Sequence, residues 1–556
     1  MYLISMAQPV EKRSGYDGII LGAGHNALIL ATYLGQAGLR MLAIDRAAVA
    51  GGGLATLEYP RQSGFLHNTH AFFQRALTAM PWYADLDLER HGARYIEPEL
   101  NVALLTRDGR ALEWWTDIER TIASVAQFDR RDAETLRRWH DEFVPIVAGI
   151  LAPENRSPPL PPDQRRKLLE RTAAGRRLLE VSALSPLEFV QREFANPTVM
   201  AGLLFFNGLR EVDMRVHGFG HHIAALIASP AKAQMSRGGS AALARALESA
   251  MRASGGDIRL LTEPARIVVE GGRAVGIETR EGEMIRARHL VASSLNPHQT
   301  FLELLDPTAL PDVIRERAAR FQYNLLAPLF ALHLNLQEPP RYLAAANHPE
   351  LAHAFMTIVG LDHVDQFFDI IRHHEAGTIP PTVMWGACPT LFDASQAPEG
   401  KHTAFMWEKV PYRLRGDPAG WDQESNAHGR VMLDLWQQYA PNMADAVIES
   451  FVRSPLDIER TLPNMREADL LVGAFTQDQV GYHRPFPGAG AYRTHVGGLY
   501  LCGSSSHPGG NITGLPGYNA AQVILGDLGI QADWMPPPLA ERLGVRPGFD
   551  PGLTLV

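Results

Sequence analysis

The pattern of apolar and polar residues near the N-terminus predicts one βαβ unit. Residues 19–21 form a short apolar run that ends at Gly22. Apolar residues then recur at helical spacing over residues 27–34, and a second apolar run over residues 40–44 ends at Asp45. A strand, a helix and a second strand in this order are typical of two parallel strands joined by a helix.

The turn between the first strand and the helix has the pattern of a dinucleotide-binding fingerprint. Residues 22–27, Gly-Ala-Gly-His-Asn-Ala, are a GxGxxA form of it. Gly22 permits the tight turn, Gly24 lets the backbone approach a pyrophosphate, and Ala27 is small enough for close packing of helix on strand. Asp45 ends the second strand, where its carboxylate can accept hydrogen bonds from a ribose. The pattern predicts nucleotide binding, the alternative being a glycine-rich turn without a ligand.

The residues after the acid favour FAD over NAD. Arg46 follows Asp45 directly, and Gly51, Gly52 and Gly53 come after four intervening residues. This continuation resembles the second signature of flavoproteins in the amine oxidase and phytoene desaturase superfamily. In that group the glycines bring the chain against the FAD pyrophosphate a second time.

A C-terminal segment supports the same resemblance. An apolar strand over residues 496–501 closes on Gly503, and the segment to Gly514 resembles the flavin-closing motif GLYLxGxxxHPGGxxxG of the phytoene desaturase-like family. The resemblance is closest to the subgroup of pyridine nucleotide-disulfide oxidoreductase domain-containing protein 2. It covers residues 16–70, 236–305 and 469–529.

The resemblance implies an α/β fold of mixed α+β character. We expect a Rossmann-like FAD-binding domain of the glutathione reductase type with an inserted substrate domain. Because the matching blocks lie at the start, middle and end of the chain, the FAD-binding domain is expected from residues 1–75, 231–305 and 469–556. The substrate-binding domain is then expected from residues 76–230 and 306–468.

One FAD molecule, bound non-covalently, is the implied cofactor. Neither Cys388 nor Cys502 lies in a recognisable attachment motif, and the chain has no CxxC pair and no second dinucleotide fingerprint. The expected FAD contacts are Gly22, Ala23, Gly24, Asn26, Ala27, Asp45, Arg46, Gly51, Gly52, Gly53, Ala265, Gly503, Ser504, Gly510, Asn511 and Ile512.

Two positions depart from the family pattern. Asp45 stands where the family more often has Glu, so the ribose contact is expected to be looser or bridged by water. Pro264 falls near the position whose backbone usually pairs with the adenine, and proline has no N–H. The contact then either shifts to Ala265 or uses only the carbonyl.

In the family, backbone N–H groups before a helix face the edge of the flavin where negative charge accumulates on reduction. In this chain that helix is expected to start near Thr513.

Catalytic residues stay unassigned, with His507, His70 and His222 as candidates. His507 belongs to the flavin-closing motif and His70 follows the glycine signature, but both can equally be ordinary hydrogen-bonded histidines. His222 stands beside His221, four residues after His217. Glycines in this stretch make a stable helix doubtful and no carboxylate is close in sequence, so we expect a cavity lining and no metal site.

The resemblance implies an FAD-dependent oxidoreductase that acts on carbon–carbon bonds of a largely apolar small molecule, by desaturation, saturation or flavin-assisted isomerisation. The electron acceptor stays open between dioxygen, a quinone and another carrier.

One alternative function is that of an FAD-dependent amine oxidase or dehydrogenase, a branch that usually has a lysine near the flavin. It is less favoured because the five lysines, Lys12, Lys167, Lys232, Lys401 and Lys409, lie outside the matching blocks. Another is a non-catalytic lipid-binding escort protein resembling Rab GDP-dissociation inhibitors, against which the intact phosphate loop argues.

Composition limits the partners. With 46% apolar residues, 20% charged residues and a net charge of -9, the chain is typical of a globular protein and has no basic surface for nucleic acid. The N-terminus does not have the pattern of a signal peptide, and no apolar stretch is long enough to span a bilayer. We expect a cytoplasmic protein.

The basic segment 156–177 predicts a solvated helix face, with peripheral contact to an anionic membrane as the alternative. The oligomeric state stays open.

Overall fold

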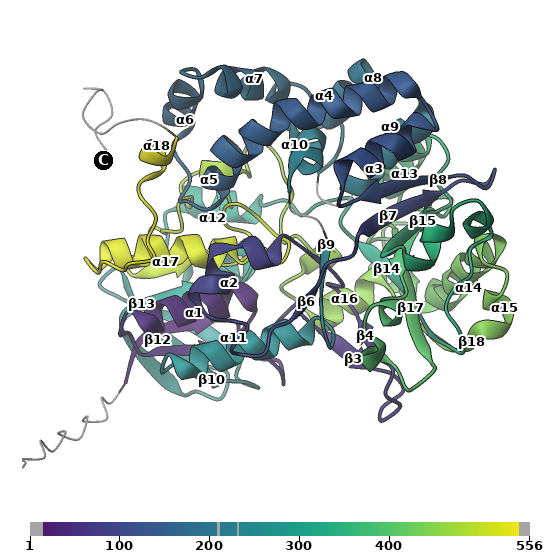
Figure 1. Ribbon diagram of the computed structural model, residues 1–556. Helices are drawn as coiled ribbons and strands as arrows, with labels where there is room; N and C mark the ends of the chain where they lie inside the picture. Colours follow the sequence, from purple (N-terminus) through teal and green to yellow (C-terminus); the bar gives the residue numbers. More distant parts are fainter. Residues whose placement is uncertain (1–14, 208–211, 231–232, 544–556) are drawn as a thin grey trace, which may run out of the picture.

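The computed structural model describes residues 15–207, 212–230 and 233–543. Residues 1–14, on which the signal-peptide prediction rests, lie outside the described part. Within it, the strands form two sheets of seven strands each and two smaller sheets. Figure 1 shows the first large sheet at lower left, the second at right, and a layer of helices across the top.

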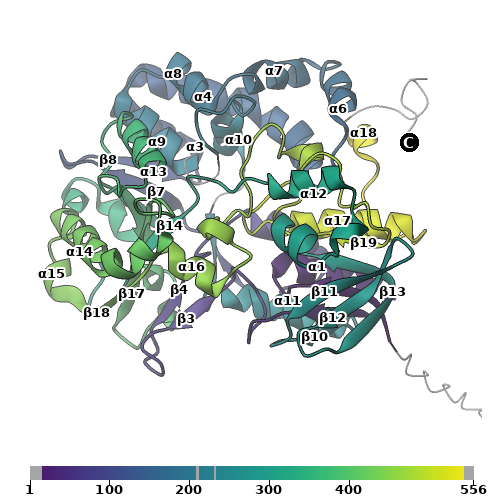
Figure 2. The ribbon, with the colours of Figure 1, turned by 180° about the vertical axis from the view of Figure 1, so that it is seen from behind.

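The first large sheet contains the predicted βαβ unit. β1 (Tyr16–Leu21) and β2 (Met41–Ile44) pair in parallel and are joined by α1 (His25–Gln36). Nearly every residue of both strands is buried, as expected for strands covered on both faces. Figure 2 shows this sheet from behind. Its other strands are β10 (Asp257–Arg259), β11 (Pro264–Glu270), β12 (Arg273–Thr279), β13 (Met284–Ser293) and β19 (Leu499–Leu501).

Three helices cover one face of the first sheet. α1 packs against α11 (Ala241–Ala253) and α17 (Leu515–Asp527), and their apolar side chains share one core. α17 begins at Leu515, two residues after the expected start near Thr513, because Gly514 adopts a left-handed φ of 68° just before it.

The second large sheet is mainly antiparallel. One of its faces packs against α14 (Trp421–Tyr439), and the other shares an apolar core with helices that include α4 (Arg130–Ile146) and α10 (His222–Ala228). Its strands, in spatial order, are β18 (Val447–Arg453), β14 (Leu329–Leu336), β17 (His402–Lys409), β16 (Met384–Ala387), β15 (Met356–Val359), β7 (Leu100–Leu105) and β8 (Ala111–Trp115).

The strands of the two sheets come from different parts of the chain. Those of the first sheet lie within residues 16–44, 257–293 and 499–501, and those of the second within residues 100–115 and 329–453. This separation supports the discontinuous division into an FAD-binding and a substrate-binding domain, which we keep as a proposal.

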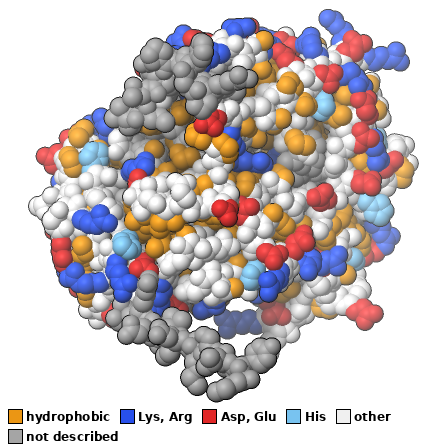
Figure 3. Space-filling model, turned by 60° about the vertical axis from the view of Figure 1, so that its left-hand side comes forward, with side chains coloured by type: hydrophobic (Ala, Val, Ile, Leu, Met, Phe, Trp, Pro, Cys, Tyr) orange, Lys and Arg blue, Asp and Glu red, His pale blue; other side chains and the backbone are white. Residues whose placement is uncertain are grey.

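The described surface carries mixed charge. On the face in Figure 3, Lys and Arg side chains are interspersed with Asp and Glu. The basic segment 156–177 forms α6 (Pro162–Leu169) and α7 (Ala173–Ser182). Ion pairs in this segment join Arg165 to Glu154, Arg166 to Glu170 and Arg177 to Glu142. None of the helices formed by the described residues has the length and apolar character needed to cross a membrane.

Candidate active site

A cavity of about 1180 Å³ lies between the two large sheets. On one side it is lined by loops that follow the strands of the first sheet, with Gly22, Asp45 and Gly503 among the lining residues. On the other side it reaches Trp385 and Trp407 of the second sheet. Ligands of parallel α/β sheets bind beyond the carboxyl ends of the strands, so this cavity is the expected place for a dinucleotide.

The two glycines of the fingerprint are required for different reasons. Gly22 has a φ of 93°, and a Cβ there would overlap with the Ser294 hydroxyl, so the fold itself requires glycine. Gly24 has a φ of -73° and a ψ of 169°, which any residue adopts, and a Cβ there would meet no protein atom within 4 Å. The protein itself therefore does not require glycine at this position, and the open space beside Gly24 belongs to the cavity, where a ligand can approach the backbone.

The N-terminus of α1 faces the same cavity. No side chain caps it, and Asn26 and Ala27 of its first turn line the cavity. The Oδ1 atom of buried Asn26 has no hydrogen-bond partner among the described residues. An uncapped helix N-terminus with polar groups beside it fits the pyrophosphate of a dinucleotide.

Asp45 follows β2 and lines the cavity. Its Oδ2 accepts a hydrogen bond from the Ala23 amide and its Oδ1 accepts one from the Ala47 amide, both at 2.8 Å. Each carboxylate oxygen has a second lone pair, so the group can still accept from ribose hydroxyls. Asp45 therefore shapes the turn and remains able to bind the ligand.

We expect Asp45→Ala to weaken FAD binding by about 1–3 kcal/mol, or roughly 5- to 150-fold, since an acceptor for the ribose is lost and two backbone amides lose their partner. Titration of the apoprotein with FAD measures this. Asp257→Ala is the matched control, because Asp257 pairs with Arg40, which directly precedes the neighbouring strand β2, and does not line the cavity. Equal affinities in the two variants would contradict the assignment.

The second glycine cluster packs beneath the fingerprint. The Gly51 amide donates to the Ala23 carbonyl at 2.8 Å, and a Cβ on Gly51 would lie 2.6 Å from that of Ala244 in α11. Ala23 and Gly51 do not line the cavity, whereas Arg46, Gly52 and Gly53 do. The first pair thus holds the two loops together and the others face the ligand space.

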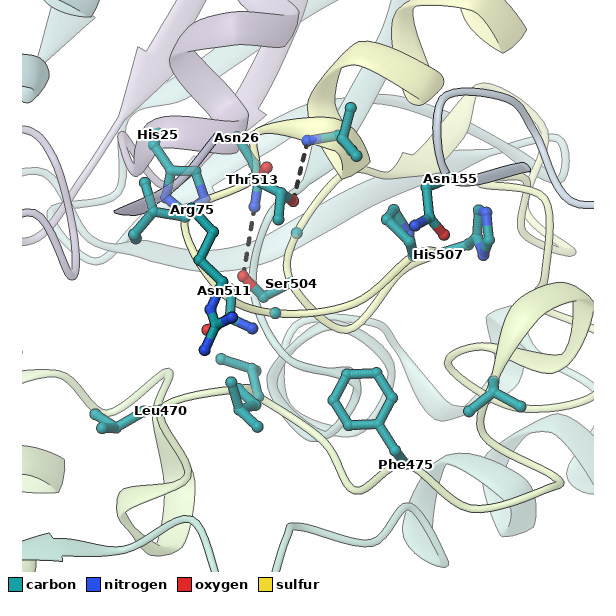
Figure 4. Close-up of a pocket in the computed structure, with 18 of the residues that line it drawn as sticks. His25, Asn26, Arg75, Asn155, Leu470, Phe475, Ser504, His507, Asn511 and Thr513 are labelled. Carbon is teal, nitrogen blue, oxygen red and sulfur yellow. Dashed lines mark hydrogen bonds between the residues drawn. The ribbon is translucent and has the colours of Figure 1, made fainter. Parts of the chain in front are cut away.

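The C-terminal motif meets the fingerprint across the cavity. Gly503, Ser504, Gly510, Asn511 and Ile512 all line it. Asn26 Nδ2 donates to Ser504 Oγ at 3.4 Å, as Figure 4 shows, and the backbone of Asn511 hydrogen-bonds the His25 ring. The structure thus brings together two motifs that are far apart in the chain.

Ala265 lies elsewhere. It is exposed on β11 and does not line the cavity. The prediction that the adenine contact shifts to Ala265 therefore finds no support. That prediction started from the missing N–H of Pro264. A single residue does not show where along the strand the chain lies nearest to the ligand.

All three candidate histidines line the cavity. His70 Nδ1 hydrogen-bonds Thr69 Oγ1 at 2.9 Å, and burial lowers the His70 pKa to about 3. His507 Nε2 donates to the Glu154 carbonyl at 3.1 Å, and burial lowers the His507 pKa to about 4. Both rings are therefore neutral near pH 7. No group of three or more His, Cys, Asp or Glu residues able to hold a metal occurs in the part of the chain that the structure describes.

One face of the second sheet completes the cavity, and sequence reasoning missed it. Leu329, Trp385, Trp407 and Lys409 lie on three neighbouring strands, where Lys409 pairs with Leu329 and Trp407 with Trp385. Lys409 is buried, and its Nζ donates to the Ala327 carbonyl at 2.9 Å. The alternation Phe405, Trp407, Lys409 is the one signal that could have indicated an inward face.

Comparison with known proteins identifies the family. No family model matches the chain. One of the limonene dehydrogenase subunits from Castellaniella defragrans is 30% identical over 547 residues, which cover 94% of this chain and 96% of that protein. The chain belongs to the phytoene desaturase-like family of FAD-dependent oxidoreductases. Pyridine nucleotide-disulfide oxidoreductase domain-containing protein 2 from Rattus norvegicus is 27% identical and covers 92% of this chain and 94% of its own. A lycopene-forming phytoene desaturase from Paracoccus sp. is 22% identical, with 92% and 97% covered.

Solved structures agree on the fold. Cyclohexylamine oxidase from Brevibacterium oxydans superposes with a TM-score of 0.58 at 15% identity, over 93% of this chain and all of that one. The solved structures confirm the expected fold class, and the relatives described above confirm the family, the FAD cofactor and the enzyme class. The individual FAD contacts and the catalytic histidines remain predictions.

Proposed function

We propose that this FAD-dependent oxidoreductase transfers hydrogen between FAD and a carbon–carbon bond of a largely apolar small molecule. The observation that carries the proposal is the continuity of the cavity, which runs from the FAD loops to the aromatic face of the second sheet. The names of two relatives refer to limonene and phytoene. A substrate of this apolar class fits a wall that includes Phe72, Leu329 and Trp407.

The chain's own contribution is binding, orientation and exclusion of water. FAD, when bound, supplies a flavin ring that accepts or returns a hydride. Residues 503–512 would hold the ring edge, while the aromatic face would hold the substrate by apolar contact. The Nε2 of His507 donates to the Glu154 carbonyl, so its Nδ1 carries a lone pair that can accept a proton, and this nitrogen makes no hydrogen bond with the described residues.

Oxidation of amines is a second candidate, and the position of Lys409 favours it. The sequence argument against it rested on the distance of all five lysines from the matching blocks. The fold nevertheless places Lys409 on the cavity wall, 5.9 Å from the Trp385 ring centroid. Lys12 and Lys232 lie outside the described residues.

Anaerobic mixing of the purified yellow protein with substrates distinguishes the two candidates. We expect apolar alkenes such as limonene to bleach the flavin absorption and primary amines to leave it unchanged. Bleaching by amines alone would overturn the proposal in favour of the second candidate.

We also expect acid precipitation to release the flavin into the supernatant. Cys388 and Cys502 are buried and neither lines the cavity, so neither thiol can reach the flavin. Burial also raises the pKa of Cys388 to about 12, which keeps this thiol protonated and unreactive. Absorption spectra of pellet and supernatant check this, and flavin that stays with the pellet would contradict it.

For the basic segment 156–177 we propose a solvated helix face. Ion pairs with Glu142, Glu154 and Glu170 neutralise part of the positive charge of this segment within the protein.

A further inference from the structure

Arg484 lies completely buried behind the flavin end of the cavity. Its exposed fraction is 1%, and it does not line the cavity itself. A buried charge is costly unless hydrogen bonds and an opposite charge compensate for it. The contacts of this guanidinium therefore indicate what the charge does for the protein.

The guanidinium binds backbone carbonyls of two separate loops. It also lies over the Phe475 ring, 4.5 Å from the ring centroid. Carbonyl acceptors of this kind orient backbone without neutralising the cation. Nη1 donates to Ala474 at 3.2 Å and to Gln479 at 3.1 Å, while Nη2 donates to Gly473 at 3.3 Å, to Val472 at 3.5 Å and to Ser504 at 3.1 Å.

Asp469 organises the same loop through its backbone amides. Its carboxylate is fully buried and accepts from the backbone amides of Asn324, Leu471 and Gly473 at 2.8–2.9 Å. Carbonyls of residues 472–474 thus turn toward Arg484, and amides of the loop turn toward Asp469. A buried cation and a buried anion together define the path of residues 469–475.

Both loops held by Arg484 form the cavity wall. Leu470 and Phe475 line it from the first loop, and Ser504 and His507 line it from the second. Figure 4 shows Leu470 and Phe475 below Ser504 and His507 in that view. The guanidinium is close behind this wall, since a Cβ built on Gly509 would lie 3.6 Å from Arg484 Nε.

The group keeps its charge at neutral pH. Burial lowers the pKa of Arg484 to about 10, and the carboxylate of Asp469 acts in the opposite direction. Positive charge in a region with little water acts over a longer range than at the surface.

We propose that Arg484 is a positioning residue that joins the two loops at the flavin end and places a fixed positive charge behind them, which favours the negatively charged, two-electron-reduced flavin. The proposal rests on the FAD-dependent function and on the flavin ring lying at residues 503–512, as the family resemblance implies. Arg484 thereby contributes both to FAD affinity and to the reduction potential.

Three variants separate the two contributions. Arg484→Met removes charge and hydrogen bonds, Arg484→Lys keeps the charge but cannot reach several carbonyls, and Arg493→Met is the control. Arg493 lies in the same C-terminal block but is half-exposed, pairs with Asp527 at 2.7 Å and does not line the cavity. The measurements are FAD titration of the apoprotein, thermal melting of the apoprotein and the midpoint potential of the bound flavin.

We expect Arg484→Met to weaken FAD binding at least about tenfold and to lower the midpoint potential. Arg484→Lys should weaken FAD binding similarly with the potential close to wild type, and Arg493→Met should change neither. A potential that falls equally in both Arg484 variants overturns the role of the charge. Unchanged FAD affinity in Arg484→Lys overturns the joining of the loops.

Two further outcomes are informative. If Arg484→Met does not fold, Arg484→Lys decides, and full FAD affinity or a lowered potential in that variant overturns the proposal. If FAD affinity falls in both variants and the potential does not move in either, the flavin ring lies away from residues 503–512, and the role of the charge is overturned. None of these measurements uses a substrate, so a failure of the proposed reaction would be seen separately in the bleaching experiment.

Discussion

Gly24→Val is expected to abolish FAD binding while the protein still folds. Valine readily adopts the extended φ and ψ of Gly24, and its Cβ would meet no protein atom within 4 Å. The side chain would instead occupy the space in which the pyrophosphate approaches the start of α1. We expect FAD affinity to fall by on the order of 100-fold or more, equivalent to about 2.7 kcal/mol. Flavin content after purification and FAD titration of the apoprotein measure this.

Gly22→Ala is the matched comparison two residues away. Here the added Cβ overlaps with the Ser294 hydroxyl and the φ of 93° disfavours alanine, so the melting temperature of the apoprotein should fall. Gly24→Val should leave that temperature nearly unchanged. If Gly24→Val retains its flavin, or melts as early as Gly22→Ala, the fingerprint is misassigned.

The parts of the site that follow local backbone rules could be predicted from the sequence. The turn at Gly22 and Gly24, the first turn of α1 with Asn26 and the acid at Asp45 depend on residues near one another in the chain, and the structure places them together at one cavity. The resemblance supplied the remote motif around Ser504, because periodicity alone cannot show which distant segment completes a sheet.

The parts that depend on tertiary contacts could not be predicted. Lys409 looked remote from the flavin because β17 lies far along the chain from the matching blocks, yet its strand forms the opposite wall of the cavity. Arg484 lies within the matching block 469–529, but its burial between two loops follows from packing alone.

Trp407→Ala is expected to lower kcat/KM for an apolar substrate while FAD stays bound. Trp407 is buried on the cavity face of β17, opposite Trp385 and 4.6 Å from the Phe405 ring, and is far along the chain from the FAD loops. Removing this aromatic wall should cost about 1.5–3 kcal/mol of substrate contact, or roughly 10- to 150-fold in kcat/KM. Steady-state kinetics with the alkene that bleaches the flavin measures the loss.

Met406→Ala on the same strand is the control for this effect. Met406 is fully buried on the opposite face of the sheet, in the core formed with α14, so its truncation should cost about 2–5 kcal/mol of stability. Because its side chain faces away from the cavity, kcat/KM should stay near wild type at temperatures where the variant is folded. An equal loss of kcat/KM in both variants would show that loosening of the sheet, and not contact with the substrate, is responsible. A loss confined to Trp407→Ala would assign substrate binding to the aromatic face of the second sheet.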